Sequence, residues 1–243
     1  MTNLNLILIQ LIIQIKMKKS KIIFISLLAV IAMFILAASI DYRLTGSKIG
    51  LVPANIKVTK ETILQYKVLS LENSDIRLFK NDTLFIEITS LKDSALPKLN
   101  YNIKNDTLFI KDSKLMQGGR VSVSIHVNSS VKAILLKNSN LTMEHFQSEN
   151  LNLGMDNSYI WLNQDKSSFN NLNILARNHS SIESVALNVD SLGIILDHSE
   201  ANIGIIARKI TSSLSDSSRL YVRQAGDMLL KKDPTSSINV NDY

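Results

Sequence analysis

Two histidines in the C-terminal half of the chain, His179 and His198, occupy the same place in successive sequence repeats, and Asp216 follows there in the next repeat. Two imidazoles and a carboxylate within reach of one another form a ligand set that a tetrahedral metal ion can accept. Asn138 and Asn157 hold the same place in two earlier repeats, however. Asn, His and Asp all tolerate positive φ, so a turn requirement explains the five residues together. We therefore predict a structural turn here and no metal site.

Carboxylates are the second group that could perform chemistry, because pectate lyases and polygalacturonases cleave polysaccharides with clustered acids on a parallel β-helix. The available acids are Asp156, Asp165, Asp190 and Asp197. They fall at different places in the repeat, mostly at turns, where acids are common. The sequence also has no H-E-x-x-H, G-x-S-x-G, G-x-G-x-x-G or phosphate-loop motif. We therefore expect a non-enzymatic protein with no catalytic residue and no cofactor, with polysaccharide lyase or hydrolase activity as an alternative.

The single tryptophan, Trp161, stands two residues after Tyr159 in a strand-like stretch. Alternation with Ile160 and Leu162 puts the two rings on one face of a strand and the two aliphatic side chains on the other. If the aliphatic side chains point into a core, the rings point outward, where they could stack on carbohydrate. Tyr159 and Trp161 are therefore the candidate binding surface, and packing of both rings beneath a loop is the alternative.

The elements that must position these residues repeat along the sequence. A hydrophobic residue, two intervening positions and a serine recur, with one extra residue in the third case: Leu136/Ser139, Met155/Ser158, Ala176/Ser180, Leu196/Ser199 and Leu214/Ser217. Apolar residues on alternate positions precede these serines, as in Leu151, Leu153 and Met155. A period of two within units and of about 20 residues between them is typical of a β-solenoid, whose turns stack about 4.8 Å apart. A β-sandwich is the alternative.

The residue before each serine is Asn, His or Asp, the types that adopt positive φ most readily. We predict that each such pair turns the chain at one corner of the solenoid and that the side chains stack as a hydrogen-bonded ladder. An earlier example is Asn73 before Ser74. The predicted turn ladder comprises Asn138, Ser139, Asn157, Ser158, His179, Ser180, His198, Ser199, Asp216 and Ser217.

The hexapeptide N-D-T-L-F-I occurs twice nearer the N-terminus, at residues 81–86 and 105–110, each time after a lysine and an alternating apolar stretch. An Asn-Asp pair between two such stretches is a signal for a β-hairpin. Residues 56–116 are therefore predicted to form short antiparallel strands ahead of the repeats.

These residues resemble the rungs of a bacterial envelope family, the autotransporter-adhesin head domain, also called the head GIN domain. The similar stretches are L-E-N-S-D-I at 71–76, L-K-N-S-N-L at 136–141, M-D-N-S-Y-I at 155–160 and L-D-H-S-E-A at 196–201. The resemblance covers roughly residues 55–240, although Asn, His or Asp replaces the turn glycines of the family. It implies an all-β fold, a right-handed parallel β-helix behind a signal or anchor, and a role in adhesion. It carries over no catalytic residue.

Nineteen uncharged residues, 22–40, follow the Met-Lys-Lys-Ser-Lys of positions 17–21. At about 1.5 Å per helical residue this segment just spans a hydrocarbon core of roughly 30 Å. Lysines before it favour export of everything that follows. Residues 17–40 are therefore expected to be one transmembrane anchor or, if cleaved near Ala37-Ala38-Ser39, a signal peptide. Residues 1–16 are an apolar leader that could precede a true start at Met17, and residues 41–55 a linker to the solenoid domain, 56–240.

Composition limits the classes of partner. The chain has no cysteine, which excludes disulfides, thiol catalysis and thiolate metal sites. Four of its 27 basic residues lie in the first 40 positions, leaving 23 basic against 21 acidic residues, so no basic face for nucleic acid is expected. We expect an exported envelope protein, at the periplasm or the cell surface, that contacts the membrane through its N-terminal helix and binds a surface glycan or protein. A structural or regulatory envelope protein without a ligand is the alternative.

Overall fold

The computed structural model describes residues 56–91, 98–116, 121–162 and 167–240, together with positions 31 and 33. The chain divides into two units, residues 1–54 and residues 55–243, and nearly all of the described residues belong to the second. The predicted leader (1–16), the linker (41–55) and all but two positions of the predicted helix (17–40) lie outside the described residues, as does Asp165. Within the described part of the chain, no helix has the length and apolar character needed to cross a membrane.

The second unit is built from β-strands, with one short 3₁₀ helix, η2 (Ser113–Met116), in the part that the structure describes. The strands are β1 (Ile56–Thr62), β2 (Val68–Glu72), β3 (Asp75–Lys80), β4 (Phe85–Leu91), β5 (Asn100–Lys104), β6 (Thr107–Lys111), β7 (Val121–Val127), β8 (Ala133–Lys137), β9 (Asn140–Glu144), β10 (Gln147–Asp156), β11 (Tyr159–Leu162), β12 (Ser168–Arg177), β13 (Ser181–Asp197), β14 (Glu200–Ser215), β15 (Arg219–Lys232) and β16 (Ser237–Val240).

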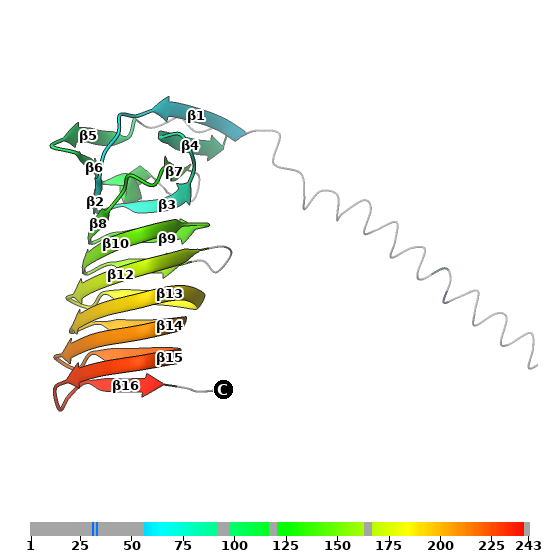
Figure 1. The fold of residues 1–243 in the computed structure, drawn as a ribbon. Helices are drawn as coiled ribbons and strands as arrows, with labels where there is room; N and C mark the ends of the chain where they lie inside the picture. The colour runs from blue at the N-terminus through cyan, green and yellow to red at the C-terminus, as the bar shows by residue number, and fades with distance from the viewer. Residues whose placement is uncertain are drawn as a thin grey trace, which may run out of the picture. The chain divides into compact units, whose positions relative to one another are not determined.

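The strands wind into a parallel β-solenoid with two faces, as Figure 1 shows. The first face stacks β6, β2, β8, β10, β12 and the C-terminal halves of β13, β14 and β15, all parallel. The second face stacks β7, β3, β9, β11, the N-terminal halves of β13, β14 and β15, and finally β16. The predicted all-β solenoid is therefore confirmed. Each circuit of the chain is a rung. Rungs pass from the first to the second face at the first corner and return at the second corner.

In-register stacking of like side chains forms the core. On the first face, Ile134, Leu153, Ile174 and Ile194 lie one above another with at most 2% of each residue exposed. Full burial of such a side chain stabilises the fold by about 1.5–3 kcal/mol. Because a single rung could not bury its own apolar residues, the rungs are stable only as a stack.

The two Asn-Asp hairpin predictions have different outcomes. Strands β5 and β6 form an antiparallel hairpin through Asn105 and Asp106, whose φ values of 51° and 57° suit a two-residue turn. The hairpin predicted at residues 81–86 is wrong, because β7 lies between β3 and β4, parallel to the former and antiparallel to the latter. Val123, Ile125 and Val127 of β7 are buried, so β7 supplies an apolar strand between them that local sequence could not reveal.

Candidate functional site

The first corner carries a ladder of buried serines, which we call the serine ladder. In each rung the backbone N–H of the corner serine donates to the hydroxyl oxygen of the corner serine in the next rung, at 3.0 to 3.2 Å: Ser74 to Ser139, Ser139 to Ser158, Ser158 to Ser180, Ser180 to Ser199, Ser199 to Ser218 and Ser218 to Ser236. The hydroxyl in turn donates to a carbonyl of its own turn, as Ser158 does to Asp156 at 2.8 Å. The ladder thus satisfies buried backbone groups, which is a structural task.

The residues beside this ladder hold the left-handed conformation, with φ between 46° and 63° at Asn138, Asn157, His179, His198 and Asp216. The prediction for Ser217 needs correction, because Ser217 is exposed and Ser218 takes the place in the ladder. This turn contains two residues of positive φ, Asp216 at 53° and Ser217 at 62°, just as the turn at Asn178 and His179 does. The extra residue moves the ladder serine one position along the chain.

The structure brings His179 and His198 together at the first corner. Their Nε2 atoms lie 2.7 Å apart and their ring centroids 4.0 Å apart, with both side chains exposed. Asp216 follows in the next rung, where its backbone N–H donates to the Asp233 carboxylate at 2.8 Å. Among the described residues, no group of three His, Asp or Glu side chains lies close enough to hold a metal ion.

Tyr159 and Trp161 lie on the outer side of β11, since Ile160 and Leu162 between and after them are buried in the core. Both rings are half-buried. The Tyr159 hydroxyl donates to the Glu183 carboxylate of the next rung at 3.0 Å. Burial, followed by this hydrogen bond, raises the pKa of Tyr159 to about 12. The pair therefore forms an outward aromatic patch on the second face, in which the Tyr159 hydroxyl is already hydrogen-bonded to Glu183.

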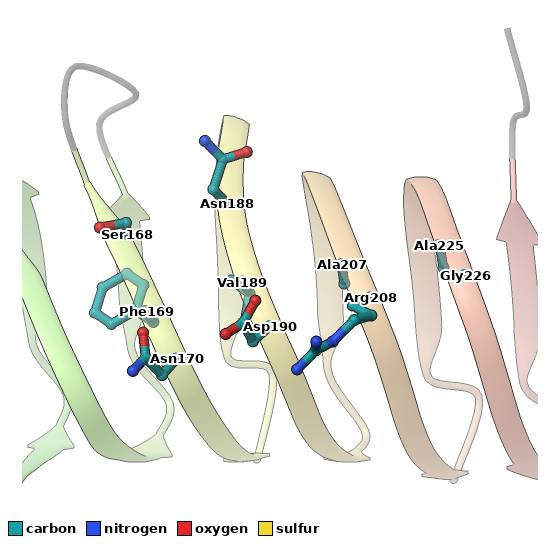
Figure 2. Close-up of a pocket in the computed structure, with 10 residues that line it drawn as sticks. All are labelled: Ser168, Phe169, Asn170, Asn188, Val189, Asp190, Ala207, Arg208, Ala225 and Gly226. Atoms are coloured by element: carbon teal, nitrogen blue, oxygen red, sulfur yellow. The ribbon is translucent and has the colours of Figure 1, made fainter.

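The described carboxylates considered for catalysis do not converge. Asp156 and Asp197 lie in one column at the end of the first face, with Arg177 in register between them. Asp190 lies at the second corner, in a groove of about 520 Å³. Figure 2 shows the Arg208 side chain extending from the next rung toward Asp190. One carboxylate and one guanidinium on this edge do not make the acid cluster of a polysaccharide lyase.

A second hollow lies on the outside of the first face and was not predicted. It has a volume of about 670 Å³, and we call it the outer hollow. One side is an outward column in which Leu135, Gly154, Leu175 and Ile195 follow one another in register. Leu135 is 47% exposed and Ile195 51%. The hollow thus offers an aliphatic surface to solvent across successive rungs.

The neighbouring column of the outer hollow is polar from Asn152 to Thr211 and ends at the exposed Leu229. Asn173 Nδ2 donates to Asn152 Oδ1 at 3.1 Å, and Thr211 lies two rungs beyond Asn173 in the same column. Gly193 separates them, and a Cβ there would lie 2.6 Å from Asn173 Oδ1. The missing side chain therefore leaves room for the amide of Asn173. Amides and hydroxyls line one side, and Lys231 is the charged residue among the lining residues.

A signal for this surface was present in the sequence. Several rungs contain three consecutive apolar residues, among them Ile134-Leu135-Leu136, Ile174-Leu175-Ala176 and Ile194-Ile195-Leu196. In a strand with a single buried face, the middle residue of such a run must point outward. Outward aliphatic residues recurring at the period of the repeat mark an exposed apolar surface rather than part of the core.

No protein-family model matches the chain, and no curated protein matches it in sequence. Solved structures align with the chain at low identity. A putative adhesin from Bacteroides fragilis is 10% identical with a TM-score of 0.51, over 77% of this chain and 97% of that one. A putative adhesin from Parabacteroides distasonis is 11% identical with a TM-score of 0.45, over 79% of this chain and 98% of that one. A putative lipid binding protein from the same species is 14% identical with a TM-score of 0.43, over 78% of this chain and 94% of that one. The first likeness supports the fold alone.

Proposed function

We propose that the protein is a non-enzymatic, extracytoplasmic binding module that holds a neutral glycan chain in the outer hollow. The observation that carries this proposal is the pairing of an aliphatic column with an amide and hydroxyl column along the same rungs. Amides and hydroxyls can exchange hydrogen bonds with sugar hydroxyls. The aliphatic column can pack against the C–H faces of the sugar rings, which removes apolar surface from water.

The repeat favours a polymer over a small molecule. Rungs stack about 4.8 Å apart, so a similar set of groups recurs at each step. A chain of equivalent sugar units lying across the rungs could make similar contacts several times, and modest contacts then add up through multivalency. The scarcity of charge among the lining residues favours a neutral chain over an acidic one.

Export and family kinship belong to the same proposal. The hydrophobic segment 22–40 would deliver or tether the solenoid outside the cytoplasm, either as an anchor or as a cleaved signal. Kinship to the head GIN family, with its right-handed winding and adhesive role, agrees with the corner motifs at 71–76 and 136–141. We also propose that translation starts at Met17, and mass spectrometry of the expressed protein tests this start site. A product that retains Thr2 or Asn3 contradicts initiation at Met17.

The aromatic patch of Tyr159 and Trp161 is a second surface for the same kind of ligand. Carbohydrates stack on exposed rings, and the bond from Tyr159 to Glu183 holds one ring in place. We rank it below the outer hollow because it occupies two outward positions of one short strand.

A matched pair of substitutions separates the two surfaces. Ile195 and Val185 are both β-branched and 51% exposed, but only Ile195 lines the outer hollow. The full-length chain in detergent micelles is first screened on an array of neutral glycans, and the strongest hit is then titrated. We expect Ile195→Ser to weaken binding at least about tenfold, while Val185→Ser and Trp161→Ala leave it unchanged.

Thermal unfolding of each variant shows whether the fold is preserved. Equal losses in Ile195→Ser and Val185→Ser would contradict the outer hollow as the site. A loss confined to Trp161→Ala would move the site to the second face, and the absence of any glycan hit would refute glycan binding.

A further inference from the structure

The histidine pair at the first corner has a geometry that the turn does not require. At the equivalent corner of two earlier rungs, Asn157 Nδ2 donates to Asn138 Oδ1 at 2.8 Å, so asparagine alone suffices to turn the chain and link the rungs. His179 and His198 replace this amide pair in two consecutive rungs, with their Nε2 atoms 2.7 Å apart. Only imidazole adds the capacity to ligate a transition metal through nitrogen.

The backbone beneath the two rings is held firmly. The His179 N–H donates to the His198 carbonyl at 2.7 Å, and the N–H of Ser180 donates to the hydroxyl of Ser199 at 3.2 Å in the buried serine ladder. Before the corner, β12 pairs in parallel register with the C-terminal half of β13, and after it the N-terminal half of β13 pairs in the same way with β14. The two rings therefore project from adjacent rungs whose separation is fixed, and little ordering is needed before a ligand binds.

We propose that His179 and His198 form a two-nitrogen binding site for a divalent transition metal ion of the copper and zinc class. Nitrogen ligands lie about 2.0–2.1 Å from such an ion, so two of them in adjacent positions are about 2.9–3.4 Å apart. The observed pair would open by only a few tenths of an ångström. The imidazole that now donates its Nε2 proton carries it on Nδ1 instead, which leaves both rings neutral and frees both Nε2 lone pairs.

The surroundings leave the site open to solvent and give it a moderate affinity for metal. It borders a shallow hollow of about 260 Å³ that is also lined by Glu200, Asp216 and Arg219. The two carboxylates favour a cation there and the guanidinium opposes it. Water fills the remaining coordination positions, because no third protein ligand lies near among the described residues. Affinity then follows the usual order of divalent metals, with copper bound most tightly.

The chain offers conservative variants for the test. His179→Asn and His198→Asn introduce the residue that already occupies this corner at Asn138 and Asn157, so the left-handed turn is preserved. His145 provides the control, since it is an exposed histidine of positive φ at the second corner, outside the pair. His145→Asn removes one imidazole without touching the proposed site.

Copper(II) is titrated into the full-length chain in detergent micelles, with calorimetry for affinity and electron paramagnetic resonance for the ligands. We expect one site with two nitrogen ligands in the wild type and in His145→Asn. In His179→Asn and His198→Asn the affinity should fall at least about tenfold and the two-nitrogen signature should disappear. Binding should also weaken as the pH is lowered, because protons compete for imidazole nitrogen.

Copper binding that is equally tight in His179→Asn, His198→Asn and the wild type would overturn the proposal, as would a loss confined to His145→Asn. Thermal unfolding of the metal-free variants verifies that each has folded. Because the outer hollow contains neither histidine, glycan binding and copper binding can fail independently of each other.

Discussion

The two corners of the solenoid solve the same problem in different ways. At the first corner every turn consists of one or two left-handed residues followed by a ladder serine, from Ser139 to Ser218. At the second corner β13 and β14 continue around the bend, with register shifts after Ser184 and after Ile203. A corner whose side chains bond to the next rung must be uniform, whereas a corner that bends within a strand is free to vary.

The variation at the second corner appears on its surface. Strand pairing there skips one column of residues that includes Asn170, Asp190, Arg208 and Gly226, and these four are all exposed and differ in charge and size. These positions line the groove of Figure 2. The first corner therefore fixes the fold, whereas the second corner can change its chemistry without unfolding the stack.

The largest effect on stability is expected at the serine ladder of the first corner. Ser158→Ala removes the acceptor for the buried Ser139 N–H and the donor to the Asp156 carbonyl. We expect the free energy of unfolding to fall by about 1–3 kcal/mol, because buried polar groups lose their partners. Chemical denaturation measures it. The control is Ser148→Ala near the second corner, where an exposed hydroxyl bonds to Asn150, and it should change stability by less than about 0.5 kcal/mol. Equal effects would contradict the distinction between the corners.

A smaller effect is expected from the left-handed residues. Asn157 has a φ of 46°, which alanine adopts only with strain, so Asn157→Ala should cost about 1–2 kcal/mol. Asn157→Gly should lower the free energy of unfolding by less, because glycine has no Cβ. Both variants lose the side-chain hydrogen bond to Asn138. Denaturation of the two variants side by side separates strain from hydrogen bonding. If glycine proved as costly as alanine, strain would not be what selects this residue.

The smallest effect concerns pH at the last turn of the first corner. Hydrogen bonds from Ser236, and also from Asp216 and Thr235, lower the pKa of Asp233 from 3.8 to about 2. A carboxyl group whose pKa is lower in the folded state stabilises the fold at pH values above its pKa in the unfolded state. This contribution is lost as the pH falls from about 4 toward 2. The protection factors of residues 236–240 against hydrogen exchange, which correct for the intrinsic pH dependence of the exchange rate, should therefore fall in this window. Asp233→Asn should abolish that pH dependence, and its persistence would exclude Asp233 as the cause.

The solenoid and its first corner were predictable because a repeated turn leaves a repeated mark on the sequence, as Asn157-Ser158 shows. The pairing of β7 between β3 and β4 was not, since it joins segments about 40 residues apart. Ser218 was missed because an extra left-handed residue shifts the motif. The outer hollow was not predicted either, because alternation within one strand shows that a residue such as Leu175 points outward, whereas its alignment with Gly154 and Ile195 depends on how the rungs stack.

The serine ladder also bears on how the protein would respond to force. From Ser139 onward it joins residues 18 to 22 positions apart, and each rung contacts only its neighbours. Pulled from one end, the stack would therefore unravel stepwise, and each released 19-residue rung would lengthen the chain by about 60–70 Å at full extension. A stack built in this way yields in small increments under load and does not unfold in one step.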